Sequence, residues 1–197
     1  MPFATVLAWL CAPATAPAQE PIPTASIVRF NTLCATCHEG ECSGRLSFRL
    51  DPGATNNHIR RYTGDISPES ARDLQNLLVR MKFDCGYHAI SIPPPTDGRW
   101  RAELLAQLHA VQENAYFVPL GPLAPGRQRF TLIFDQDATV SIQLISASFE
   151  ITELPSVKAI AGRAAVALDA QCAGEHYLRL RTEQPARLLA LEREPHL

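Results

Sequence analysis

The pattern of hydrophobic and polar residues divides the chain into two halves with different periods. In the first half, apolar residues recur at helical spacing. Ile27, Phe30 and Cys34 share one face of a first predicted helix. A second helix is predicted from Ser67, an N-cap residue directly ahead of Pro68. Its apolar face consists of residues at the same spacing: Ala71, Leu74, Leu77, Leu78 and Met81.

A third helix is predicted after a proline-rich loop over residues 84–95. It begins at Thr96 or Asp97 and ends near Asn114. Its buried side consists of the large apolar residues Trp100, Leu104, Leu105 and Leu108. Between the first two helices, the alternation of residues 45–50 indicates a short extended segment, followed by a turn at 51–53.

The second half of the chain alternates with period two, which is typical of half-buried strands. Examples are Phe130, Leu132 and Phe134, and later Val140, Ile142 and Leu144. About six short strands separated by turns favour a small antiparallel β-sandwich. The predicted fold class is therefore α + β in two domains: a small all-α domain over residues 19–115, a Pro/Gly linker over 116–128 and the sandwich over 129–197.

Composition narrows the function classes. The chain has 197 residues and a net charge of −2, with no basic stripe, so nothing in it favours binding to nucleic acid. No apolar run reaches the length of a transmembrane helix. Residues 1–18 contain a short apolar core and end in Ala16-Pro17-Ala18, which predicts a cleavable signal peptide and a periplasmic, exported protein.

The most specific chemical signal is the C-x-x-C-H motif of Cys34, Cys37 and His38, which attaches a c-type haem. Two thiols three positions apart lie on one face of a helical turn, so both can bond to the vinyl groups of one porphyrin. The next residue, His38, is placed to bind the iron as proximal ligand. Arginines that could bind the haem propionates through paired hydrogen bonds are Arg45, Arg49, Arg60 and Arg61.

The cysteine count agrees with an oxidising compartment. Six cysteines are present, of which Cys11 lies in the predicted signal peptide and two belong to the motif. Of the remaining Cys42, Cys85 and Cys172, the first two would form a disulfide between the loop after the motif and the end of a later helix. The alternative is three unpaired buried thiols.

With this motif in place, residues 26–114 resemble a class I-like monohaem cytochrome c. The order of a first helix, C-x-x-C-H, an irregular loop, a helix opened by Ser-Pro-Glu, a proline-rich loop and a last helix is similar in both. In that family the first and last helices cross, which would place Ile27 and Phe30 against Trp100. The resemblance implies one covalent haem c on Cys34 and Cys37 with His38 as an axial ligand.

The chain departs from that family at the sixth iron ligand. The family usually supplies a methionine just ahead of the last helix, where this chain has Ile92 followed by three prolines. Met81 is the leading replacement, because its thioether lies on an apolar helix face. His88 is the second choice, and His58 and Cys85 are less favoured.

Three functions are compatible with these features. The leading hypothesis is a periplasmic electron carrier that exchanges electrons with a redox partner protein, a dehydrogenase, reductase or oxidase. The alternative is a haem enzyme or ligand sensor with an open or labile sixth coordination site. A third is a structural zinc site made by Cys34, Cys37, His38 and Cys42. No catalytic triad, carboxylate pair or phosphate-binding loop is recognised.

Overall fold

The computed structural model describes residues 22–40, 42 and 52–194. The predicted signal peptide, residues 1–18, lies outside the described residues, as do Arg45 and Arg49. Among the helices that are described, none is long and apolar enough to cross a membrane.

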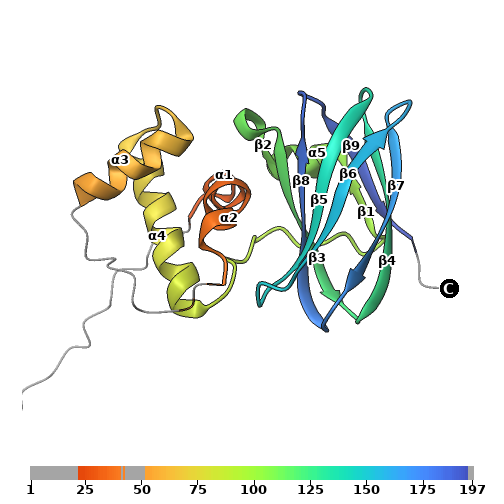
Figure 1. The fold of residues 1–197 in the computed structure, drawn as a ribbon, viewed down its shortest axis with the longest axis horizontal. Helices are drawn as coiled ribbons and strands as arrows, with labels where there is room; N and C mark the ends of the chain where they lie inside the picture. Colours follow the sequence, from red (N-terminus) through yellow and green to blue (C-terminus); the bar gives the residue numbers. More distant parts are fainter. Residues whose placement is uncertain (1–21, 41, 43–51, 195–197) are drawn as a thin grey trace, which may run out of the picture.

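The strands of the described chain form two antiparallel sheets that face each other (Figure 1). The first sheet has the order β1-β9-β4-β7 and contains β1 (Arg99–Arg101), β4 (Gly126–Phe134), β7 (Arg163–Ala170) and β9 (Leu188–Arg193). The second has the order β2-β3-β8-β5-β6 and contains β2 (His109–Ala110), β3 (Ala115–Leu123), β5 (Ala138–Ser146), β6 (Ile151–Ala159) and β8 (Gly174–Thr182).

The predicted period-two strands are confirmed. In β4, Phe130, Leu132 and Phe134 are all buried, and in β5 so are Val140 and Ile142. Since successive side chains point to opposite faces of a sheet, each of these strands covers the space between the two sheets with one apolar face.

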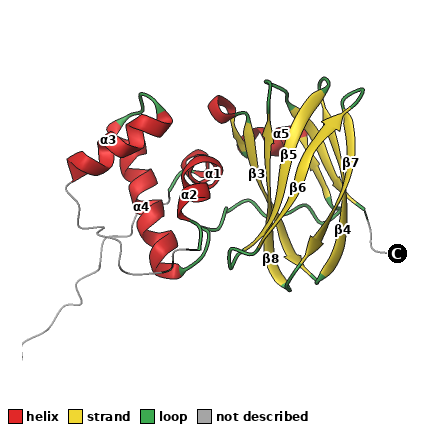
Figure 2. Ribbon diagram, viewed as in Figure 1, coloured by secondary structure: helices red, strands yellow, loops and turns green. Residues whose placement is uncertain are grey.

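The helices occupy the N-terminal part of the chain and one connection within the sheets (Figure 2). The N-terminal elements are α1 (Thr24–Arg29), a π-helical turn (Phe30–Cys34), α2 (Ala35–His38), α3 (Pro52–Thr63) and α4 (Pro68–Asp84). The connection contains α5 (Ala102–Gln107) and a 3-10 turn (Val111–Glu113).

Residues at its two ends specify where helix α4 begins and ends. The Ser67 Oγ accepts a hydrogen bond from the Ser70 backbone N–H at 3.1 Å, and Pro68 occupies the first helical position. At the other end Cys85 adopts a left-handed conformation with φ of 52°, and its N–H donates to the Met81 carbonyl. The predicted N-cap and apolar face of this helix are confirmed.

The third predicted helix, from residue 96 or 97 to near 114, is confirmed only over α5 (Ala102–Gln107) and is wrong on either side of it. Residues 99–101 form β1, in which Trp100 pairs with Leu191 and lies buried between two exposed arginines. The Trp100 indole N–H donates to the Pro119 carbonyl at 3.1 Å, so this side chain belongs to the sheets. The Arg-Trp-Arg alternation has the period of a strand, and it outweighs the helical spacing of the leucines that follow it.

The predicted fold class is also wrong. The chain is mainly β, with two antiparallel sheets, and the described helices do not form a small all-α cytochrome c domain. A terminal helix to cross the first one is replaced by β1, the short α5 and β2. One hydrophobic core runs through the molecule, from Ile27 and Leu77 in the helices to Phe117 and Leu178 in the sheets.

The predicted linker over 116–128 is largely strand. Residues 115–123 form β3, which pairs with β8. The glycine and prolines in this stretch do not interrupt the strand. Gly121 lies at a register shift of β3, where its φ is +76°. The aromatic and branched residues Tyr116, Phe117 and Val118 are all buried.

The helical layer packs on the outer face of the second sheet. Strands β3 and β8 are therefore buried on both faces, unlike β4 and β7, whose burial alternates. Two arginines of β8 join the layers: Arg179 bonds to the Glu39 carboxylate and to the Tyr87 hydroxyl, and Arg181 donates to the Thr32 carbonyl at 2.6 Å.

Candidate functional site

The three residues of the C-x-x-C-H motif lie on one continuous helical segment. Cys34 is the last residue of the π-helical turn, and Cys37 and His38 lie in α2. The wider π turn changes the direction in which the following side chains point, and such turns occur frequently at functional sites. Cys37 is exposed, whereas Cys34 and His38 are half-buried.

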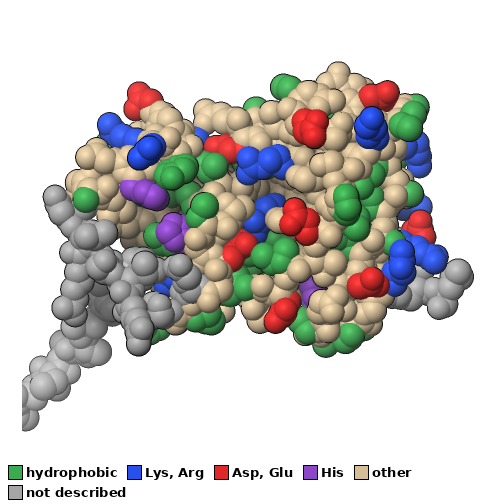
Figure 3. Space-filling view, in the orientation of Figure 1, with side chains coloured by type: hydrophobic (Ala, Val, Ile, Leu, Met, Phe, Trp, Pro, Cys, Tyr) green, Lys and Arg blue, Asp and Glu red, His purple; other side chains and the backbone are tan. Residues whose placement is uncertain are grey.

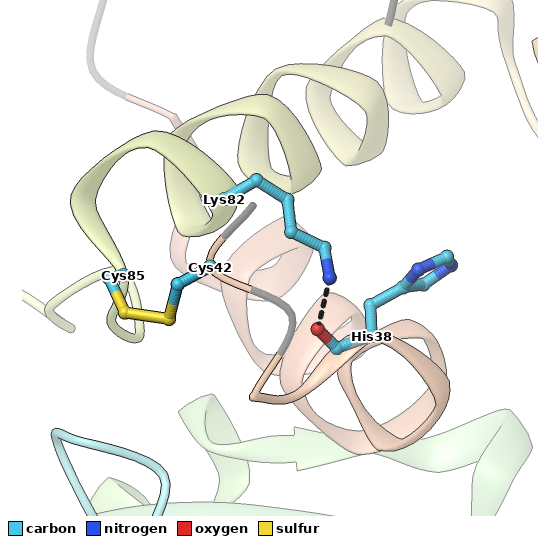
Figure 4. The surroundings of a disulfide bond; sticks show 4 residues. All are labelled: His38, Cys42, Lys82 and Cys85. Atoms are coloured by element: carbon cyan, nitrogen blue, oxygen red, sulfur yellow. Dashed lines mark hydrogen bonds between the residues drawn. A yellow bond between two sulfur atoms is a disulfide. The ribbon is translucent and has the colours of Figure 1, made fainter. Parts of the chain in front are cut away.

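The end of this segment is tied to α4 twice (Figure 4). The Lys82 ammonium donates to the His38 carbonyl at 2.5 Å, a favourable place for a cation because helix carbonyls are unsatisfied there. The predicted disulfide between Cys42 and Cys85 is confirmed, with the two Cα atoms 5.0 Å apart. In Figure 4 the His38 ring points away from both ties.

A predominantly apolar cavity of about 150 Å³ lies beside the motif. Its walls come from the attachment segment, from α3 and from α4. The lining residues are Phe30, Leu33, Cys34, Cys37, His38, Thr55, His58, Ile59, Tyr62, Leu74, Gln75 and Leu78. Both motif cysteines are free thiols. The cavity therefore brings two thiols and two imidazoles together on an apolar surface.

The two imidazoles come from different helices, His38 from α2 and His58 from α3. The ring centroids of His38 and His58 are 6.4 Å apart, and the ring planes are inclined by 67°. The His58 ring also contacts Tyr62, one helical turn further along α3, at 5.0 Å between centroids. Figure 3 shows histidine side chains close together on the helical part of this face, beside hydrophobic side chains.

Burial suppresses ionisation at the inner thiol. Desolvation raises the pKa of Cys34 to about 11, although the nearby Arg29 partly opposes the effect. At neutral pH this sulfur is therefore a thiol rather than a thiolate.

Arg29 fixes the opening between α1 and α3. Its guanidinium donates to the Thr63 carbonyl at the end of α3 at 2.8 Å, to Glu113 at 3.0 Å and to Gln112. One side chain of the first helix thus holds both the last residue of α3 and the 3-10 turn that leads into the sheets. This placement positions the α3 wall of the cavity.

The other residues considered as iron ligands lie elsewhere. Met81 is buried in the shared core and does not line the cavity. His88 lines a different, polar groove on another side of α4, where burial and Arg80 lower its pKa. Cys85 is consumed by the disulfide. Arg60 and Arg61, the described candidates for binding haem propionates, are exposed residues of α3.

The zinc hypothesis is wrong. It needs the Cys42 thiolate, which is bonded to Cys85. Within the described ranges, no group of three or more histidine, cysteine, aspartate or glutamate side chains is arranged to hold a metal ion.

The α3 wall of the cavity was missed in the sequence. Thr55, His58, Ile59 and Tyr62 occur at i, i+3, i+4 and i+7, which is the spacing of one helix face. Asn56, Asn57 and the preceding glycine, all typical of turns, obscured this signal.

Comparisons with known proteins show no family. No protein-family model and no curated protein matches the chain. Among solved structures, the Anabaena sensory rhodopsin transducer is 11% identical with a TM-score of 0.28, over 40% of this chain and 86% of that one. A mutant of a family 29 carbohydrate-binding module is 13% identical with a TM-score of 0.29, over 40% of this chain and 61% of that one. A family GH115 4-O-methyl-α-glucuronidase is 11% identical with a TM-score of 0.34, over 56% of this chain and 19% of that one.

The resemblance to class I-like monohaem cytochromes c is therefore wrong. The chain is mainly β, the last helix of that family is replaced by strands, and no cytochrome family matches. The described residues also contain no multi-ligand metal cluster. The similarity of element order ended at residue 96, where the chain enters the sheets.

Proposed function

We propose that this protein is an exported electron carrier with one haem attached covalently through Cys34 and Cys37. The observation that supports the proposal most is the placement of the motif: both thiols and the His38 imidazole line a single apolar cavity. The proposal concerns the cofactor and its use, and it places the chain in no known family.

The residues of the cavity fit a haem in chemistry. Phe30, Leu33, Ile59, Leu74 and Leu78 offer the hydrocarbon contacts that a porphyrin face requires. A porphyrin also supplies four of the metal ligands itself, so the protein has to provide only axial ones, and a cluster of three protein ligands is not needed. Pockets that bury most of a ligand usually measure about 300–1,000 Å³, so part of the ring would extend beyond this cavity of about 150 Å³.

The chain's own residues have distinct tasks in this proposal. Cys34 and Cys37 would hold the group, His38 would bind its iron, and the apolar wall of the cavity would exclude water from it. The bound haem supplies a one-electron redox centre. The exposure of Cys37 places the attachment edge near the surface, where a redox partner protein can approach through a small, transient interface.

Production in a bacterial periplasm that attaches haem to exported proteins tests the proposal. We expect a haem that survives denaturation and acid–acetone extraction, a c-type reduced spectrum and a reversible one-electron midpoint. The variant Cys34→Ser/Cys37→Ser, which keeps the Cys42–Cys85 disulfide, should lack covalent haem. A folded wild-type protein without covalent haem under these conditions would contradict the proposal.

The alternative function, a haem enzyme or ligand sensor, can be distinguished by whether the iron binds an external ligand. It requires an iron that binds an external ligand such as carbon monoxide in the reduced protein. A carrier whose two axial positions are both occupied by protein side chains resists such binding.

A further inference from the structure

The cavity has a second wall that the C-x-x-C-H motif does not explain. Helix α3 contributes Thr55, His58, Ile59 and Tyr62 to it, and three of these four side chains are polar or aromatic. His58 is exposed, and its ring contacts within the described residues are those with His38 and Tyr62. Packing of the core does not account for an exposed imidazole that lies beside the His38 ring at the apolar cavity.

The distance between the two imidazoles is informative. Imidazole nitrogens bind transition metals at about 2.0 Å, and each ring adds about 1 Å from nitrogen to centroid, so two imidazoles on opposite sides of one metal have centroids about 6 Å apart. The His38 and His58 centroids are 6.4 Å apart. The rings are inclined by 67°, so they do not stack face to face.

The other candidate ligands do not line the cavity. Met81 is 1% exposed and packs in the shared core; it lies on the same face of α4 as Leu74 and Leu78 but is not among the residues that line the cavity. The Met81 carbonyl accepts hydrogen bonds from Cys85 and Gly86, which fixes this last turn of α4. His88 lines the polar groove with Arg72 and Asp73, away from the motif.

We infer that His58 is the sixth ligand of the haem, so that the iron is held between two histidines, His38 and His58. This inference rests on the proposed function. Tyr62 lies one turn along α3 from His58 and contacts its ring, which supports the ring orientation. Arg29, bonded to the Thr63 carbonyl, holds the end of the same helix.

The test uses the full haem-loaded protein and three variants. We expect wild type to be low-spin in electron paramagnetic resonance and to bind no carbon monoxide when reduced. His58→Ala should lose the low-spin signal, gain carbon monoxide binding and recover the low-spin state with added imidazole. Met81→Leu and His88→Ala, the matched controls, should retain the wild-type spectra.

A fourth variant tests the ligand through the midpoint reduction potential of the haem. Methionine in place of the second histidine raises haem potentials, so His58→Met should shift the midpoint upward and introduce the near-infrared band of thioether ligation. Because His58 is exposed, these substitutions leave the core intact, and the Cys42–Cys85 disulfide reports folding.

The outcomes separate the two proposals. A haem-loaded wild type that is high-spin, or a His58→Ala variant with an unchanged low-spin spectrum, overturns the role of His58 and leaves covalent haem attachment standing. Loss of the low-spin state in Met81→Leu assigns the position to Met81 and also overturns it. Absence of covalent haem in folded wild type overturns the proposed function and this inference together.

Discussion

His109 is a half-buried titratable side chain of β2, where the helices meet the sheets. Its ring stacks on Tyr116 with centroids 4.1 Å apart and planes inclined by 3°. Its Nε2 atom is buried and finds no hydrogen-bond partner within the described residues. Burial lowers the pKa of His109 below its ordinary value of 6.5, although Glu113 partly opposes the shift.

The protein should therefore lose stability in mild acid through His109. With the pKa lower in the folded state, the unfolded chain binds more protons below pH 6.5, so stability falls as the pH drops through the folded value. His109→Phe should flatten this dependence. Urea midpoints of wild type and variant at several pH values between 8 and about 5 measure it, and an equal slope in both proteins would contradict the assignment.

The two motif thiols, Cys34 and Cys37, should differ in reactivity while both are free. Because thiolates rather than thiols react with alkylating agents, the raised pKa of Cys34, about 11, protects it at neutral pH. In protein made without haem attachment, iodoacetamide should modify the exposed Cys37 well ahead of Cys34. Peptide mass spectrometry of a time course checks the order, and denatured protein serves as the control because burial is lost there.

At the scale of elements, helix α4 depends on its N-cap. Ser67→Ala removes the acceptor for the Ser70 N–H and should lower the free energy of unfolding by about 1 kcal/mol. Ser67→Asp retains an acceptor and should remain near wild type. Chemical denaturation of the three proteins measures the difference, and equal losses in both variants would show that the cap contributes nothing.

The disulfide should contribute more than the cap. The Cys42–Cys85 bond spans 43 positions, a chain segment that includes the whole of α3 and α4. Cross-linking a loop of this length restricts the unfolded chain, so Cys42→Ser/Cys85→Ser should lose about 2–4 kcal/mol. Cys172→Ser, which changes a free cysteine, is the control and should change stability little.

These elements show how far the sequence predicts the fold. Helix α4 follows from local chemistry, since Ser67 and Pro68 specify its start. Strands β4 and β5 follow from alternation alone. Strand β3 does not, because its residues Tyr116 to Val118 are buried on both faces and lose the period-two pattern. That burial depends on the helical layer above the sheet, which no local pattern in β3 encodes.

The candidate site was also predictable only in part, because local sequence shows some of its residues and tertiary packing brings in the others. Cys34, Cys37 and His38 are adjacent in the chain, so their motif is visible directly. His58 faces them only because α3 folds back over the cavity, a tertiary arrangement. The prediction of Met81 relied on a resemblance whose last helix this chain lacks, and that prediction stays untested.

At the scale of the whole molecule, the helical layer and the sheets share a buried ion pair. Arg179 in β8 and Glu39 after α2 have side chains only 5% and 10% exposed. Glu39→Ala leaves the Arg179 guanidinium buried, with the Tyr87 hydroxyl as its remaining side-chain partner among the described residues, and it should cost about 3 kcal/mol. Glu194→Gln, at the exposed pair with Arg129, should cost less than about 0.5 kcal/mol. Similar costs at both sites would contradict a coupling role for the buried pair.

A shared core also implies a shared unfolding transition. Trp100 reports on the sheets, since its indole is buried there and bonded to Pro119. In a Trp9→Phe background it is the sole tryptophan. Its fluorescence and the far-UV circular dichroism of the helices should then change together in urea, because both layers belong to one core. Two separate midpoints would show independent domains.

The Cys42–Cys85 disulfide also depends on the order in which the cysteines are synthesised and oxidised. Cys34, Cys37 and Cys42 lie within nine positions and are made well before Cys85. An oxidant that meets the nascent chain early finds only these three thiols within reach of one another, and any bond among them removes a motif thiol or the partner of Cys85. If oxidation is delayed until α4 is complete, Cys42 can bond to Cys85 while Cys34 and Cys37 stay free, so slower oxidation should raise the yield of correctly bonded protein.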